Sequence, residues 1–161
     1  MCAQTLKLSL KTAFTTLCLL ALNVAGAATE PPETFQSVDG VAIYLGVMPA
    51  QIVRGHPPAQ QENRMHGGIP EGRNSVHLVV ALFDEASGKR IEGAQITAEV
   101  SELGLGGKSK KLDTMRIADT ITYGNYFVMM SEKNYRIRLS IRLPGGAKPL
   151  KASFTHRHFA P

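Results

Sequence analysis

The sequence predicts an all-β protein, an immunoglobulin-like β-sandwich of about seven strands that follows a cleavable signal peptide. Three observations predict the fold. Short apolar segments follow one another at spacings of roughly 8–12 residues. Turns rich in glycine, proline and asparagine separate these segments. No stretch repeats its apolar residues with a helical period over the length of a helix, so we expect packed layers of strands.

The first 27 residues have the three parts of a secretory signal peptide. Lys7 and Lys11 give a basic start, Thr12–Leu22 is largely apolar, and Ala25–Ala27 supplies small residues at a cleavage position. Cleavage after Ala27 would leave 134 of the 161 residues, enough for one domain, and would lower the formal net charge from +5 to +3. We therefore expect an exported protein, most simply in a bacterial periplasm, with no electrostatic case for nucleic acid.

Both cysteines of the chain, Cys2 and Cys18, lie in the segment to be removed. Disulfides, thiolate metal sites and cysteine nucleophiles are therefore excluded from the mature protein. The alternative, a lipid-modified Cys18 as the new N-terminus, is disfavoured because Thr15–Leu17 before it is not of the expected Leu-Ala-Gly type. No later apolar run approaches the roughly 20 residues that a membrane span requires.

After the signal peptide, residues 28–37 form a polar leader with paired prolines, which we expect to be disordered. The sandwich domain follows at residues 38–161. Its first strand is Val41–Met48, an apolar run that Pro49 ends. Residues 54–75 then contain three prolines and four glycines, which predicts a 22-residue loop. A loop of this length inside a compact domain indicates either a functional segment or disorder.

Six further strands are expected after this loop. Val76–Phe83 is apolar throughout, as in a buried strand. Ala94–Val100 alternates, so that Ile96 and Val100 share one face. Turn residues bound the remaining four strands, which are Lys110–Ile117, Tyr123–Met130, Tyr135–Leu143 and Leu150–His158.

The mature chain shows none of the common catalytic patterns. It has no nucleophile elbow, no phosphate-binding loop and no pair of carboxylates beside a predicted cleft. Four tyrosines, no tryptophan and no basic–aromatic stripe also argue against binding of single-stranded nucleic acid. We therefore expect a binding protein and not an enzyme.

Histidine and methionine carry the strongest functional pattern. Their donors favour copper, because methionine suits Cu(I) and histidine suits both Cu(I) and Cu(II). In an exported protein without cysteine, methionine is the practical soft ligand. Met48 and one of Met129 and Met130 are expected in the core. We predict a metal site with ligands drawn from Met65, His66, His77, Met115, His156 and His158.

Each candidate ligand also has a structural interpretation. Met65 and His66 are the strongest candidates, because two glycines follow them in the loop and an exposed methionine has no packing role there. His77 could be a half-buried structural histidine in an apolar strand. His156 and His158 share one face of the last strand and could be solvent-facing residues of an edge strand.

Two stretches resemble known domains. Residues 76–100 (VHLVVALFDEASGKRIEGAQITAEV) resemble the opening of bacterial immunoglobulin-like domains, and Tyr123–Tyr126 followed by Tyr135–Leu139 resembles their closing hairpin. With the Met-His-Gly-Gly loop and the histidine-bearing end added, the chain is similar to small periplasmic immunoglobulin-like proteins that bind copper or accompany metal uptake. The resemblance implies that Met and His side chains hold the metal at one end of the sandwich.

The sequence thus predicts an exported periplasmic protein that binds a copper ion, Cu(I) or Cu(II), and buffers it or hands it to a membrane partner. The alternative is a metal-free immunoglobulin-like module that docks onto another envelope protein, because long loops often carry binding surfaces. Convergence of the loop with the strand ends that carry His77 and His156 would favour the metal site. Copper binding should weaken below about pH 6, because histidines protonate near their unperturbed pKa of ~6.5.

Overall fold

The computed structural model describes residues 34–54, 68–117 and 119–159. The predicted signal peptide lies outside these residues. No helix in the described part of the chain is long and apolar enough to cross a membrane. The elements are β1 (Phe35–Val38), β2 (Val41–Pro49), α1 (Ala50–Arg54), β3 (Ser75–Asp84), β4 (Gln95–Glu102), β5 (Lys108–Ile117), β6 (Thr120–Val128), β7 (Lys133–Arg142) and β8 (Leu150–His158).

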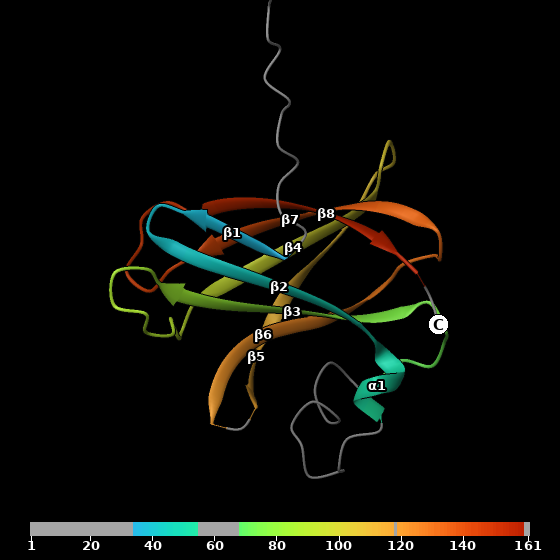
Figure 1. The fold of residues 1–161 in the computed structure, drawn as a ribbon, viewed down its shortest axis with the longest axis horizontal. Helices are drawn as coiled ribbons and strands as arrows, with labels where there is room; N and C mark the ends of the chain where they lie inside the picture. The colour runs from blue at the N-terminus through green and yellow to red at the C-terminus, as the bar shows by residue number, and fades with distance from the viewer. Residues whose placement is uncertain (1–33, 55–67, 118, 160–161) are drawn as a thin grey trace, which may run out of the picture.

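The eight strands pair antiparallel in the order β1-β2-β3-β6-β5-β4-β7-β8. β5 belongs to both layers of the sandwich, because Lys108–Leu112 pairs with β4 whereas Asp113–Ile117 pairs with β6. Figure 1 shows the two layers and the short α1 that follows β2. From β2 onward, the order matches the A-B-E-D and C-F-G sheets of an immunoglobulin domain. The predicted all-β, immunoglobulin-like class is confirmed.

Alternating side chains of both layers form the core. The residues that are fully buried include Ile43 of β2, Leu78 of β3, Ile96 of β4 and Phe154 of β8. Burying one such side chain contributes about 1.5–3 kcal/mol. Because each strand directs every second residue inward, the core positions also fix which residues lie on the outer faces.

β1 corrects the prediction of disorder for residues 35–37, whereas residues 28–33 of the predicted leader lie outside the described part. Phe35–Val38 pairs with β2 through a two-residue turn at Asp39 and Gly40, which both have positive φ angles of 49° and 76°. Asp-Gly is the preferred sequence for such a turn. The side chain of Gln36 also bonds to the backbone N–H and C=O of Ser153 in β8, so β1 links the edges of the two layers.

The predicted closing hairpin is also corrected. β6 pairs with β3 and β5, whereas β7 pairs with β4 and β8, so the two strands lie in different layers. The segment between them is a corner between layers. There the hydroxyl of Tyr135 accepts a hydrogen bond from the backbone N–H of Met130 at 2.7 Å. A tyrosine at the start of this strand that bonds a few residues upstream is a hallmark of immunoglobulin-like folds.

The strand directions define one end of the sandwich, which we call the α1 end. β2, β4, β6 and β8 finish there, and β3, β5 and β7 begin there. Of the predicted long loop, residues 54–75, residues 55–67 lie outside the described part. The structure adds α1 before that segment, and β3 already begins at Ser75.

Candidate metal centre

One layer of the sandwich consists of β1, β2, β3, β6 and the second half of β5. A row of three side chains crosses the outer face of this layer at the α1 end. His77 of β3 lies opposite Met48 of β2 on one side and opposite Tyr126 of β6 on the other. Directly opposed residues of antiparallel strands project to the same face, with their Cβ atoms about 4.5–5.5 Å apart. The row faces outward, because the neighbouring Val76 and Leu78 point into the core.

His77 is buried although it lies outside the core between the layers. Its exposed fraction is 0%, and that of Tyr126 is 5%. The two rings lie 4.7 Å apart between centroids and are tilted by 31°. α1 contacts both β3 and β2. The ring of Tyr126 therefore packs against the imidazole of His77 in a buried environment.

Gly124 of β6 makes room for a second donor beside this imidazole. A Cβ atom at Gly124 would lie 2.6 Å from Cε of Met115 and 2.8 Å from Nε2 of His77. The thioether end of Met115 and the imidazole nitrogen therefore reach one point from two different strands. Met115 is fully buried, and Asp113 lies directly opposite Gly124 on the same face of the sheet. We call these residues the His77–Met115 site.

The donors of this site fit a copper ion better than other metals. A thioether and an imidazole are soft to intermediate ligands of the kind that Cu(I) prefers, and Met48 adds a second thioether next to His77 in register. Within residues 34–54, 68–117 and 119–159, no three His, Cys, Asp or Glu side chains gather as a zinc site would need. The space that Gly124 leaves open receives the methyl end of the Met115 thioether and the Nε2 atom of His77.

His156 and His158 lie together elsewhere. Both follow Ala152 and Phe154 with period two on β8, and those two residues belong to the core. Their rings therefore face the space between the layers at the α1 end, with centroids 5.8 Å apart. His158 is 4% exposed, and desolvation by burial lowers the pKa of its imidazole. The predicted strand ligands thus form two pairs on different faces, and His77, His156 and His158 lie towards the α1 end.

Met65 and His66, the loop ligands predicted from the sequence, lie outside the described residues. Their role stays a prediction. The sequence interpretation placed Met48 in the core, but the structure puts it on the outer face beside His77. Gly124 and Tyr126 were not recognised as site residues. Alternation along β2 predicts an outward position for Met48, because Ile43, Leu45 and Val47 occupy the inward positions.

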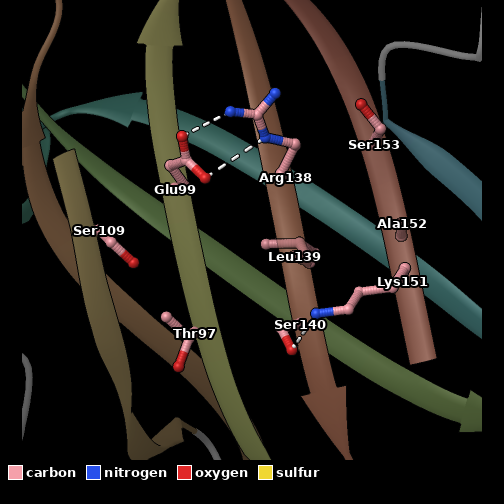
Figure 2. Close-up of a pocket in the computed structure, with 9 residues that line it drawn as sticks. All are labelled: Thr97, Glu99, Ser109, Arg138, Leu139, Ser140, Lys151, Ala152 and Ser153. Atoms are coloured by element: carbon pink, nitrogen blue, oxygen red, sulfur yellow. Dashed lines mark hydrogen bonds and ion pairs between the residues drawn. The ribbon is translucent and has the colours of Figure 1, made fainter. Parts of the chain in front are cut away.

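A separate groove of about 490 Å³, lined mostly by polar residue types, lies on the outer face of the layer formed by β4, β7 and β8 (Figure 2). Arg138 of β7 forms an ion pair with Glu99 of β4, and this contact lowers the pKa of the Glu99 carboxyl. Lys151 donates a hydrogen bond to the hydroxyl of Ser140 at 2.8 Å. The groove contains no histidine or methionine, so it does not offer the donors that copper prefers. Its lining residues are Thr97, Glu99, Ser109, Arg138, Leu139, Ser140, Lys151, Ala152 and Ser153.

Comparison with known proteins shows similarity in structure but not in sequence. No protein-family model and no curated protein sequence matches the chain. The fold is similar to that of a DUF4426 family protein from Pseudomonas aeruginosa PAO1, with a TM-score of 0.58 and 17% identity over 80% of this chain and 96% of that one.

Two further solved structures with the same fold contain copper. A copper-bound variant of FetP from uropathogenic Escherichia coli has a TM-score of 0.63 and 16% identity, covering 82% of this chain and 98% of that one. The copper-reconstituted P19 protein from Campylobacter jejuni has a TM-score of 0.56 and 15% identity, covering 81% and 96%. At these identities the comparisons establish the fold, and the resemblance inferred from the sequence is confirmed at that level.

Proposed function

We propose that this chain is an exported copper-binding protein that buffers copper or hands it on, without covalent chemistry. The observation that carries the proposal is the convergence of His77 and Met115 over Gly124. Structures of similar fold that contain copper support the choice of metal. The absence of cysteine from the predicted mature chain supports a methionine-based site.

The residues of the site have separate roles in this proposal. His77 binds copper through Nε2, and Met115 adds a thioether that favours Cu(I) over harder divalent ions. Met48 is placed to supply a further sulfur ligand from the neighbouring strand. Tyr126 holds the imidazole plane by its ring contact. Burial keeps competing water from the donors, so that binding depends on ligand softness and geometry.

The first test is a titration of the mature chain, residues 28–161, with Cu(I), Cu(II), Zn(II) and Fe(II). Calorimetry and mass spectrometry would give affinity and stoichiometry for each metal. The proposal expects copper to bind most tightly, with a dissociation constant well below about 10 µM. Binding no tighter than that value for any of the four metals would refute it. A Met65→Ala/His66→Ala variant shows whether the loop residues contribute, as the sequence predicts.

A second candidate function is a metal-free docking module, and one observation favours it. Large apolar side chains are exposed at the α1 end, on α1, on the β4–β5 turn, at the end of β6 and after β8. Exposed apolar side chains of this kind occur on protein-binding surfaces. This candidate expects no selective metal binding by the chain. The exposed residues are Ile52, Leu103, Leu105, Val128, Met130 and Phe159.

A further inference from the structure

His156 and His158 occupy an unusual position for histidines at the end of an edge strand. β8 is the outermost strand of its layer, so a solvent-facing position was the simplest expectation. The alternation of β8 instead places both rings on the inner face, in line with Ala152 and Phe154. Tyr135 lies directly opposite His156 on this inner face, and Met129 at this end is fully buried.

The imidazole of His158 is buried without a partner for one nitrogen. Its Nε2 atom is inaccessible to solvent and has no hydrogen-bond partner among the described residues. A neutral imidazole has one ring nitrogen with a free lone pair, which can bind a metal ion. Buried polar atoms in native proteins are almost always satisfied, so such a nitrogen calls for a ligand.

The spacing of the two rings fits one metal ion between them. Metal–imidazole bonds are about 2 Å long, so two imidazoles on opposite sides of one ion have ring centroids about 6 Å apart. The observed separation is 5.8 Å, with a tilt of 43° between the rings. Stacked rings in direct contact would lie closer than this. The separation is close to the roughly 6.6 Å between alternate residues of a strand, and it leaves room for one shared ion.

The number of donors selects the ion. Structural Zn²⁺ sites require four ligands, and no group of three His, Cys, Asp or Glu side chains occurs among the described residues. Cu(I) has a filled d shell and accepts two nearly collinear ligands, and imidazole suits it. We propose that His156 and His158 form a two-coordinate Cu(I) site on the inner face of β8, separate from the His77–Met115 site and independent of it.

The test compares Cu(I) stoichiometry and copper X-ray absorption in matched variants of the mature chain. Met115→Leu disables the first site, and the variant is expected to keep one Cu(I) with two nitrogen neighbours and no sulfur. The further substitution His158→Phe preserves the bulk of the ring and is expected to abolish binding of this remaining ion. Circular dichroism checks that each variant is folded, and His156→Gln provides a second removal of a ligand should His158→Phe not fold.

The outcomes separate this inference from the proposed function. Loss of all Cu(I) binding in Met115→Leu would overturn the second site while leaving the first intact. Retention of one Cu(I) in the folded Met115→Leu/His158→Phe and Met115→Leu/His156→Gln variants would also overturn it. If the Met115→Leu substitution changes nothing but the β8 variants each remove one ion, the second site stands and the His77–Met115 site fails.

Discussion

The Nε2 atom of His77 and the Cε atom of Met115 meet over Gly124, at 2.8 Å and 2.6 Å from the position that a Cβ atom would take there. The three residues come from β3, β5 and β6, and β3, which β4 separates from the other two in the chain, becomes the neighbour of β6 only in the sheet. The end of a thioether side chain and an imidazole nitrogen are thereby held near one another in a buried place outside the hydrophobic core.

Replacing Gly124 by alanine should close the site and strain the sheet. The new methyl group would meet Met115 and His77 and would also lie 2.9 Å from the backbone oxygen of Leu78, which cannot move aside easily. We expect a loss of about 1–3 kcal/mol in the free energy of unfolding, measured by urea denaturation, together with loss of copper binding.

Gly46→Ala is the matched control for this substitution. Gly46 lies on β2, where the nearest atoms to a new Cβ, those of Val79, are 3.9 Å and 4.0 Å away. The free energy of unfolding of this variant should lie within about 0.5 kcal/mol of the wild-type value. Equal stability of the two alanine variants would show that the close approach over Gly124 is not real.

The stability of the metal-free protein should depend on pH through His158. Burial lowers the pKa of this imidazole in the folded state, whereas the unfolded chain protonates near the ordinary value of 6.5. The unfolded state then binds more protons below that pH, so the free energy of unfolding should fall as pH decreases from about 6.5 and stay level above it.

The His158→Phe variant isolates this contribution. With the buried imidazole replaced by an aromatic ring, the decline of stability between about pH 6.5 and pH 5 should become shallower. Urea denaturation at half-unit intervals of pH gives the slope. An unchanged slope in the variant would mean that His158 is as accessible to protons in the folded state as in the unfolded one.

Tyr135→Phe should weaken the corner between the two layers. The substitution removes the hydroxyl that accepts the hydrogen bond from the backbone N–H of Met130. A loss of about 0.5–1.5 kcal/mol is expected for one such bond, seen as a lower midpoint of thermal unfolding. Tyr44→Phe is the control, because Tyr44 is 47% exposed, and it should leave the midpoint nearly unchanged.

Gln36→Ala should loosen the link between β1 and β8. The amide of Gln36 makes two hydrogen bonds to the backbone of Ser153, so we expect a loss of about 1–2 kcal/mol. Hydrogen exchange should quicken at the amide of Ser153, which loses its acceptor. Exchange there at the wild-type rate would contradict a structural role for β1. The exposed Gln95→Ala serves as the control.

The strands could be predicted because burial imposes a visible period. Seven of the eight were anticipated from apolar runs and turn residues, and Leu150–His158 has the predicted limits. β1 was missed because Phe35–Val38 is short and half-buried, so its apolar signal is weak. The turn at Asp39 and Gly40 was the available evidence for it.

The site was harder to predict than the fold. His77 and Met115 could be nominated by donor type, but their meeting depends on strand register, which a single sequence does not reveal. The roles of Met48 and Gly124 follow from the same register. The period of two on β8 grouped its two histidines correctly. Which face of the strand they occupy could be decided only once the positions of the two layers were known.

The most direct measurement of the central claim is the Cu(I) affinity of Met115→Leu and Met129→Leu in competition with a Cu(I) chelator. Both methionines are fully buried, and leucine conserves their volume, so stability should change little in either variant. We predict that Met115→Leu loses high-affinity binding at the His77–Met115 site, with a dissociation constant at least about tenfold weaker, and that Met129→Leu binds as the wild type does. Equal affinities in both variants would contradict the account.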